Sequence, residues 1–186
     1  MVPIMSLWLP ILLSAVFVFI ASSMIHAVLT YHYKDFKGVP EDDKLMTALR
    51  GFNLSPGEYF VPYAGTAKVR KSVEFREKMK KGPTVFMTVW ESGMASMGKN
   101  LVIWFVYSVI IGIFSAYITG RALGPGASYL EVFRFAGFTA FSCYTVASWQ
   151  DSIWFNRSWR RTITGTIDGL VYGLLTAGTF GWLWPH

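Results

Sequence analysis

The chain has 186 residues, of which 53% are hydrophobic and 17% aromatic, and this composition is more apolar than a soluble domain of such length usually carries. The net charge is +6, but 12 of the 17 Lys and Arg residues lie between residues 34 and 99, so membrane topology explains the basicity better than nucleic-acid binding does. Cys143 is the single cysteine, which excludes an intrachain disulfide, a cysteine zinc cluster and a CxxC redox pair.

Four apolar runs reach the roughly 20 residues that a helix needs to cross a hydrocarbon core about 30 Å thick. They predict transmembrane helices at about 4–30, 101–120, 128–148 and 162–184. The first run has no Lys or Arg before its apolar core, which is unlike a secretory signal peptide. We therefore expect a retained helix, with cleavage near residues 21–23 as the alternative.

The segment between the first two runs is predicted to fold as a small α-β-α-β insert. Acidic residues begin its first helix and β-branched or aromatic residues mark its strands. The expected order is a helix at 44–50, a strand at 58–63, a helix at 72–81 and a strand at 84–90. The predicted fold class is thus an all-α membrane bundle of four transmembrane helices with a small α/β insert between helices 1 and 2. Its three parts are the first helix at 1–30, the insert at 31–99 and a three-helix region at 100–186.

Positive charge is concentrated in the insert and in a short loop that holds Arg157, Arg160 and Arg161. Because basic loops collect on the cytoplasmic side of a membrane, we expect both termini outside and both basic loops inside. Three tryptophans near helix ends fit an aromatic belt on the outer side, namely Trp8, Trp182 and Trp184. The three loop arginines, with Lys68, Arg70 and Lys71 of the insert, are candidate contacts for anionic lipid headgroups, and a merely solvated surface is the alternative.

Several short stretches carry a resemblance to a known family. They are residues 44–50 (KLMTALR), 56–59 (PGEY), 97–100 (MGKN), 104–105 (WF), 129–134 (YLEVFR), 168–170 (DGL) and 180–185 (FGWLWP). Together they resemble an uncharacterised bacterial inner-membrane family with four transmembrane helices and a cytoplasmic insert. The resemblance implies this architecture and a bacterial inner-membrane location, and it carries over no activity, ligand or catalytic residue.

Small residues recur every four positions in two of the apolar runs, which lets helix backbones approach closely in lipid. The fourth run has Gly165, Gly169, Gly173, Ala177 and Gly181, and the second has Ser108, Gly112, Ala116 and Gly120. We expect a seam between the second and the fourth helix within one chain. Homodimerisation and docking to another membrane subunit are the alternatives.

Ionisable side chains within apolar runs are costly, so four of them are candidate polar sites: Asp168, Glu131, Arg134 and His26. Glu131 and Arg134 are three residues apart and are expected to pair with each other. Asp168 is expected to bridge to an arginine or to accept hydrogen bonds from the third helix. The alternative for Asp168 is a proton or cation site.

His26 and His32 are six residues apart, which would place them on different faces of one helix, so no metal, haem or other cofactor is expected. The sequence also has no nucleophile triad, P-loop or dinucleotide fingerprint. The preferred function is therefore a non-enzymatic accessory, scaffold or assembly subunit of a membrane complex, with the bilayer and other membrane subunits or a second copy as partners. One alternative is a small dimeric transporter or channel that uses Asp168. The other is a lipid-directed membrane enzyme that uses His26, His32 and Asp35.

Overall fold

The computed structural model describes residues 1–93 and 96–186, which are mostly helical and include a two-stranded antiparallel sheet. The chain divides into two compact units. The helical unit comprises Met1–Lys37 and Ser96–His186, and the insert unit comprises Gly38–Ala95. A mostly helical fold with a small sheet is what the sequence predicts.

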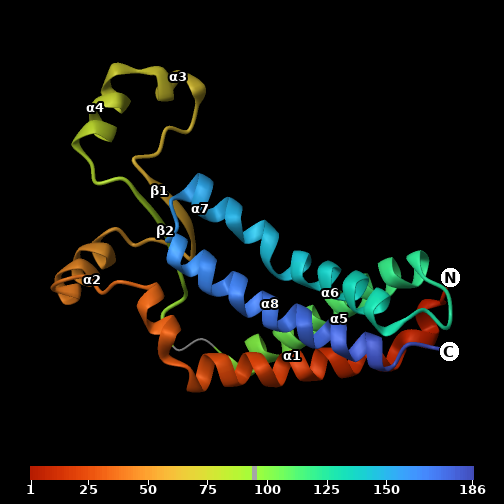
Figure 1. The fold of residues 1–186 in the computed structure, drawn as a ribbon. Helices are drawn as coiled ribbons and strands as arrows, with labels where there is room; N and C mark the ends of the chain where they lie inside the picture. Colours follow the sequence, from red (N-terminus) through yellow and green to blue (C-terminus); the bar gives the residue numbers. More distant parts are fainter. Residues whose placement is uncertain (94–95) are drawn as a thin grey trace. The chain divides into compact units, whose positions relative to one another are not determined.

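The helical unit is built on four long helices (Figure 1). They are α1 (Trp8–Val28), α5 (Met97–Ala122), α6 (Tyr129–Thr145) and α8 (Trp159–Trp182). The shorter helical segments of this unit are η1 (Ile4–Leu7), η2 (Thr30–Asp35), η3 (Val146–Ser148) and α7 (Trp149–Phe155). Within the unit, α8 packs along α6 and against α1, and α5 packs against α1 and α6.

Two of these helices are long and apolar enough to cross a membrane, judged by length and composition. They are the continuous segment Ile4–Val28, with 25 residues, and α5, with 26 residues. α6, with 17 residues, and α8, with 24, are not among these two candidates. The structure therefore supports two candidate spans, and four spans remain a prediction.

Serine caps begin α5 and α6. The Ser96 hydroxyl accepts a hydrogen bond from the Lys99 amide, and Ser128 forms a capping box with Glu131. In that box the Glu131 carboxylate accepts from the Ser128 amide at 3.0 Å and from its hydroxyl at 2.8 Å. The expected pair with Arg134 is wrong, because the carboxylate turns back to the helix start, and no ion pair within 4 Å joins these two described residues.

The small-residue faces pack against other helices than expected. A Cβ atom at Gly173 of α8 would come within 3.0 Å of the Phe141 Cβ on α6, and one at Gly137 of α6 would lie 2.7 Å from the Ala177 Cβ. On α5, a Cβ at Gly112 would lie 3.2 Å from the Ile11 carbonyl of α1. The expected seam between the second and the fourth helix is therefore wrong, because four-residue spacing marks a narrow face but does not say which helix will occupy it.

The core of the helical unit includes a cluster near both chain termini, where Leu7, Ala136 and Phe180 are fully buried. Trp184 belongs to the same cluster and its indole N–H donates to the Gly124 carbonyl at 3.0 Å. This tryptophan is thus a buried packing residue, whereas Trp8 and Trp182 of the expected aromatic belt are exposed.

The insert unit contains the four expected elements and one further short helix, α3, between the strands. They are α2 (Asp42–Gly51), β1 (Gly57–Val61), α3 (Ala67–Lys71), α4 (Val73–Lys81) and β2 (Val85–Val89). The strands pair in register from Gly57 with Val89 to Val61 with Val85, and β1 ends before Pro62, which cannot donate to a ladder. The expected helix at 72–81 begins at Ser72, whose hydroxyl caps α4 and separates it from α3. Lys68, Arg70 and Lys71 of α3 are all exposed.

Candidate metal centre

The chain turns after α1 and brings two histidines together. α1 ends at Val28, Leu29 is extended, and η2 packs against the ends of α1 and α8. His32 thereby stacks on His26, with ring centroids 4.6 Å apart and an angle of 22° between the ring planes. The expectation that these residues lie on different faces was wrong because it continued the helix past residue 28.

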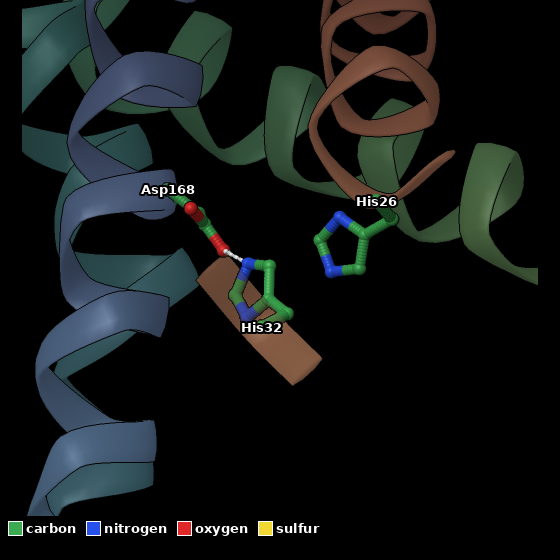
Figure 2. Close-up of side chains that lie close together, drawn as sticks. All are labelled: His26, His32 and Asp168. Atoms are coloured by element: carbon green, nitrogen blue, oxygen red, sulfur yellow. Dashed lines mark ion pairs between the residues drawn. The ribbon is translucent and has the colours of Figure 1, made fainter. Parts of the chain in front are cut away.

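Asp168 of α8 completes a cluster with the two histidines (Figure 2). Its Oδ2 atom lies 2.9 Å from the Nε2 of His32, and its Oδ1 atom accepts a hydrogen bond from the Tyr31 hydroxyl. One possible ligand atom from each of His26, His32 and Asp168 lies within 4.8 Å of the other two. The buried carboxylate thus finds its partners on η2, and the expected partners, an arginine or hydroxyls of the third helix, are wrong.

A second carboxylate holds His32 from the other side. The Nδ1 of His32 lies 2.7 Å from the Oδ2 of Asp35, which also accepts from the Thr164 hydroxyl at 3.0 Å. The Nε of Arg160 lies 3.4 Å from the other Asp35 oxygen. Burial raises the pKa of Asp35, but the hydrogen bonds from His32 and Thr164 and the positive charges beside it outweigh burial, so the pKa lies below its usual value. Asp35 is therefore an ionised acceptor.

The hydrogen bonds of both histidines leave Nε2 as the free ring nitrogen. His26 Nδ1 lies 3.1 Å from the Ser22 carbonyl, which can only accept, so this nitrogen carries the proton. His32 Nδ1 faces the Asp35 carboxylate and carries the proton for the same reason. A ring that carries a proton on Nδ1 alone holds a lone pair on Nε2, which a metal ion could take up. The buried Nε2 of His32 has no partner in hydrogen-bond geometry among the described residues, although Asp168 lies 2.9 Å away.

A pocket of about 490 Å³ lies beside the cluster, and His26 and Asp168 form part of its wall. Four aromatic side chains from three helices line it as well, namely Trp104, Tyr107, Tyr144 and Tyr172. The indole N–H of Trp104 donates to the Ser22 hydroxyl at 2.8 Å, which fixes the ring. The hydroxyl of Tyr172 is buried and has no hydrogen-bond partner among the described residues. This volume is in the range of small-molecule sites.

The other residues singled out by the sequence have different surroundings. Arg160 joins the cluster through Asp35 and donates to the Tyr31 carbonyl at 3.3 Å. Arg161 lies over the ring of Phe36, 5.3 Å from its centroid. Gly165 and Gly169 line the pocket, whereas Glu131 and Arg134 do not. Tyr31 is the contact that sequence reasoning missed, because an aromatic residue beside a helix end has no distinctive spacing.

Comparison of the chain with family models, with curated proteins and with solved structures gives no match. The resemblance to a bacterial inner-membrane family therefore remains a prediction. The chemistry of the cluster must be inferred from its own geometry.

Proposed function

We propose that this protein is an integral membrane metalloprotein that binds one divalent transition-metal ion at His26, His32 and Asp168. The observation that carries the proposal is that His26, His32 and the buried Asp168 each bring one possible ligand atom within 4.8 Å of the other two, while both Nδ1 atoms lie within hydrogen-bond distance of an oxygen acceptor. Metal-binding histidines usually donate their second ring nitrogen in this way, which fixes the ring and raises its basicity. His32 with Asp35 behind it has the arrangement of a carboxylate–histidine–metal triad.

The ligand types favour Zn²⁺ or Fe²⁺. Two imidazoles and one carboxylate suit these ions, whereas Mg²⁺ and Ca²⁺ prefer oxygen ligands alone. Three protein ligands leave at least one position for water or substrate, as in catalytic zinc sites and in non-haem iron oxygenases. A metal-dependent membrane enzyme is therefore the preferred function, and it develops the lipid-directed enzyme that is one of the two alternatives from the sequence. The accessory-subunit and transporter roles are the competing proposals.

The exposed surfaces of the candidate spans support a membrane location. Only 33% of the apolar window in the segment Ile4–Val28 and 28% of that in α5 are buried, whereas the core helix of a soluble protein would be mostly buried. The outward side chains are large and apolar, for example Leu12, Val16 and Ile20 on α1 and Val106, Ile110 and Phe114 on α5. A bilayer would cover this apolar surface and keep it out of contact with water. We propose the bacterial inner membrane, with α6 and α8 as further spans.

The competing interpretation of the cluster is an imidazolium without a metal. A protonated His32 would face Asp35 on one side and Asp168 on the other, and with Arg160 the two positive charges would balance the two carboxylates. This arrangement would give His26 no role, although its ring stacks on His32 and its Nδ1 is bonded. The two interpretations differ in metal content.

Metal analysis of the purified protein tests the proposal. We expect the detergent-purified parent to carry about one Zn²⁺ or Fe²⁺ per chain by inductively coupled plasma mass spectrometry. His26→Ala, His32→Ala and Asp168→Asn should lose it, and Co²⁺ reconstitution should give a visible spectrum in the parent alone. His186→Ala is the matched control, because His186 is the third histidine of the chain and lies exposed at its end.

Circular dichroism of each variant measures its helical content and so shows whether the variant is folded. Helical content equal to that of the parent assigns a loss of metal to the ligands and not to unfolding. A parent that neither holds metal nor takes up Zn²⁺, Fe²⁺ or Co²⁺ on reconstitution would overturn the proposal and leave the imidazolium pair. Full metal content in all three ligand variants would also overturn it.

A further inference from the structure

The pocket and the proposed metal centre share two residues. His26 and Asp168 line the pocket and are also proposed ligands, whereas His32 and Asp35 are not among its lining residues. A molecule in the pocket would therefore lie beside two of the proposed metal ligands. The identity of such a molecule depends on the remaining walls.

The remaining walls are dominated by aromatic rings that contact one another. Tyr144 meets Tyr172 with 5.2 Å between ring centroids and an angle of 68° between planes, and Trp104 meets Tyr172 at 5.8 Å and 63°. Tyr107 meets Tyr144 nearly at right angles, at 5.9 Å. Such edge-to-face packing is the arrangement that aromatic rings favour, and a further flat ring can join it.

One polar atom in these walls lacks a partner. Tyr172 is 4% exposed, its hydroxyl has no hydrogen bond among the described residues, and the residue lines the pocket. A buried hydroxyl without a partner costs about 1–3 kcal/mol, so an acceptor oxygen on a bound molecule would be stabilised here. The ligand should accordingly carry an oxygen on or beside its ring.

The pocket is open at residues of α1 and α5. Leu101 and Tyr107 of α5 line it and remain 40% and 39% exposed, and the polar residues His26 and Asn100 in its wall are exposed as well. In the proposed membrane the apolar part of this surface faces lipid near the end of a span, which gives a lipid-soluble ligand a route from the bilayer.

We propose that the pocket binds a lipid-soluble molecule whose head is an oxygen-bearing ring, of the quinone or phenol class. This inference rests on the proposed function, since the pocket shares His26 and Asp168 with the proposed metal site. An organic cation is disfavoured, because Asp168 already faces His32 and the Tyr31 hydroxyl.

Equilibrium binding of decylubiquinone to the metal-loaded protein in detergent tests the inference. The parent should bind it saturably, and Tyr172→Phe, which removes one hydroxyl, should bind roughly tenfold more weakly at unchanged metal content. His32→Ala should lose the metal and part of the affinity while the pocket walls stay intact. Tyr117→Phe is the control, because Tyr117 lies on α5, is 48% exposed and does not line the pocket.

The outcomes separate the two proposals. A parent with full metal content that fails to bind the quinone overturns the inference and leaves the metal site standing. Saturable, Tyr172-dependent binding to a parent that neither holds metal nor takes it up on reconstitution supports the ring pocket and overturns the metal proposal. Equal binding by the parent and Tyr172→Phe, or displacement of the quinone by benzyltrimethylammonium at equal affinity, overturns the inference.

Discussion

Asp35 has a different role from the three proposed ligands, because it acts on the metal only through His32. Its Oδ2 accepts from His32 and from Thr164, and Arg160 lies beside its other oxygen. These contacts keep Asp35 ionised, so it holds the proton of His32 on Nδ1 and leaves Nε2 for the metal. The carboxylate is a positioning residue, and its removal should weaken the site without removing a ligand.

We expect Asp35→Asn to weaken metal binding by roughly 10–100-fold, the usual effect of losing an outer partner of a histidine ligand. Competition with a chelator of known affinity measures the change. Asp151→Asn is the matched control, because Asp151 is half-exposed and its partner, Arg157, lies 3.7 Å away outside the cluster. Unchanged affinity in Asp35→Asn would show that His32 needs no carboxylate behind it, which contradicts the triad.

The sequence identifies most residues of this site but not their association. His26 and Asp168 stand out as ionisable groups in apolar runs, and His32 with Asp35 as a polar cluster after the first run. Their association depends on the end of α1 at Val28, where neither Gly nor Pro marks a stop. Because no local signal fixes that end, the sequence does not predict the turn into η2, and a helix continued past Val28 places the two histidines on separate faces.

At the scale of elements, two glycines one helical turn apart on α8 differ in their surroundings. A Cβ atom at Gly169 would overlap the Thr145 Cγ2 and come within 3.2 Å of the Tyr144 Cβ on α6. A Cβ at Gly165 would meet no atom within 4 Å. Close approach of the two helices therefore depends on Gly169 and not on Gly165.

Gly169→Ala should lower the free energy of unfolding by about 1–2 kcal/mol, since overpacking costs about 1–3 kcal/mol and the higher helix propensity of alanine returns up to about 1 kcal/mol. Gly165→Ala, which gains propensity without a clash, should be neutral or slightly stabilising. Thermal unfolding in detergent, followed by circular dichroism, compares the two variants. An equal change in unfolding temperature for the two variants would mean that α6 shifts to accommodate the added methyl group at residue 169. The glycine face would then not determine the distance between α6 and α8.

Local signals explain why the elements were predictable and their partners were not. Apolar runs predict the four long helices. Ser72 caps the start of α4 and Pro62 follows the end of β1, and each of these effects is confined to a few neighbouring residues. Which helix packs against each small-residue face is decided by the tertiary structure and not by local sequence. α6 contributes Gly137 at its contact with Ala177 of α8, a single small residue that forms no repeat in the sequence.

At the scale of the whole chain, both termini of the helical unit lie at the same end (Figure 1). The Val2 amide donates to the Gly120 carbonyl at 2.8 Å, and the Gly126 amide donates to the Pro185 carbonyl at 2.9 Å. η2, α7 and the arginines at 157–161 lie at the other end of the long helices. This arrangement is compatible with four crossings and would place the metal site at the cytoplasmic face, where basic residues collect.

Cysteine labelling in spheroplasts distinguishes four crossings from two. In a Cys143→Ser background, a membrane-impermeant maleimide should label His186→Cys, whereas Ser158→Cys and Lys68→Cys should react only after permeabilisation. If α1 and α5 alone cross, both α6 and α8 remain outside and Ser158→Cys also reacts in sealed cells, while Lys68→Cys stays protected. All three positions are exposed in the protein, so protection reports the membrane and not the fold. Labelling of Lys68→Cys from outside would show that the orientation is opposite to the proposed one. The positively charged insert would then lie on the side that the distribution of Lys and Arg disfavours.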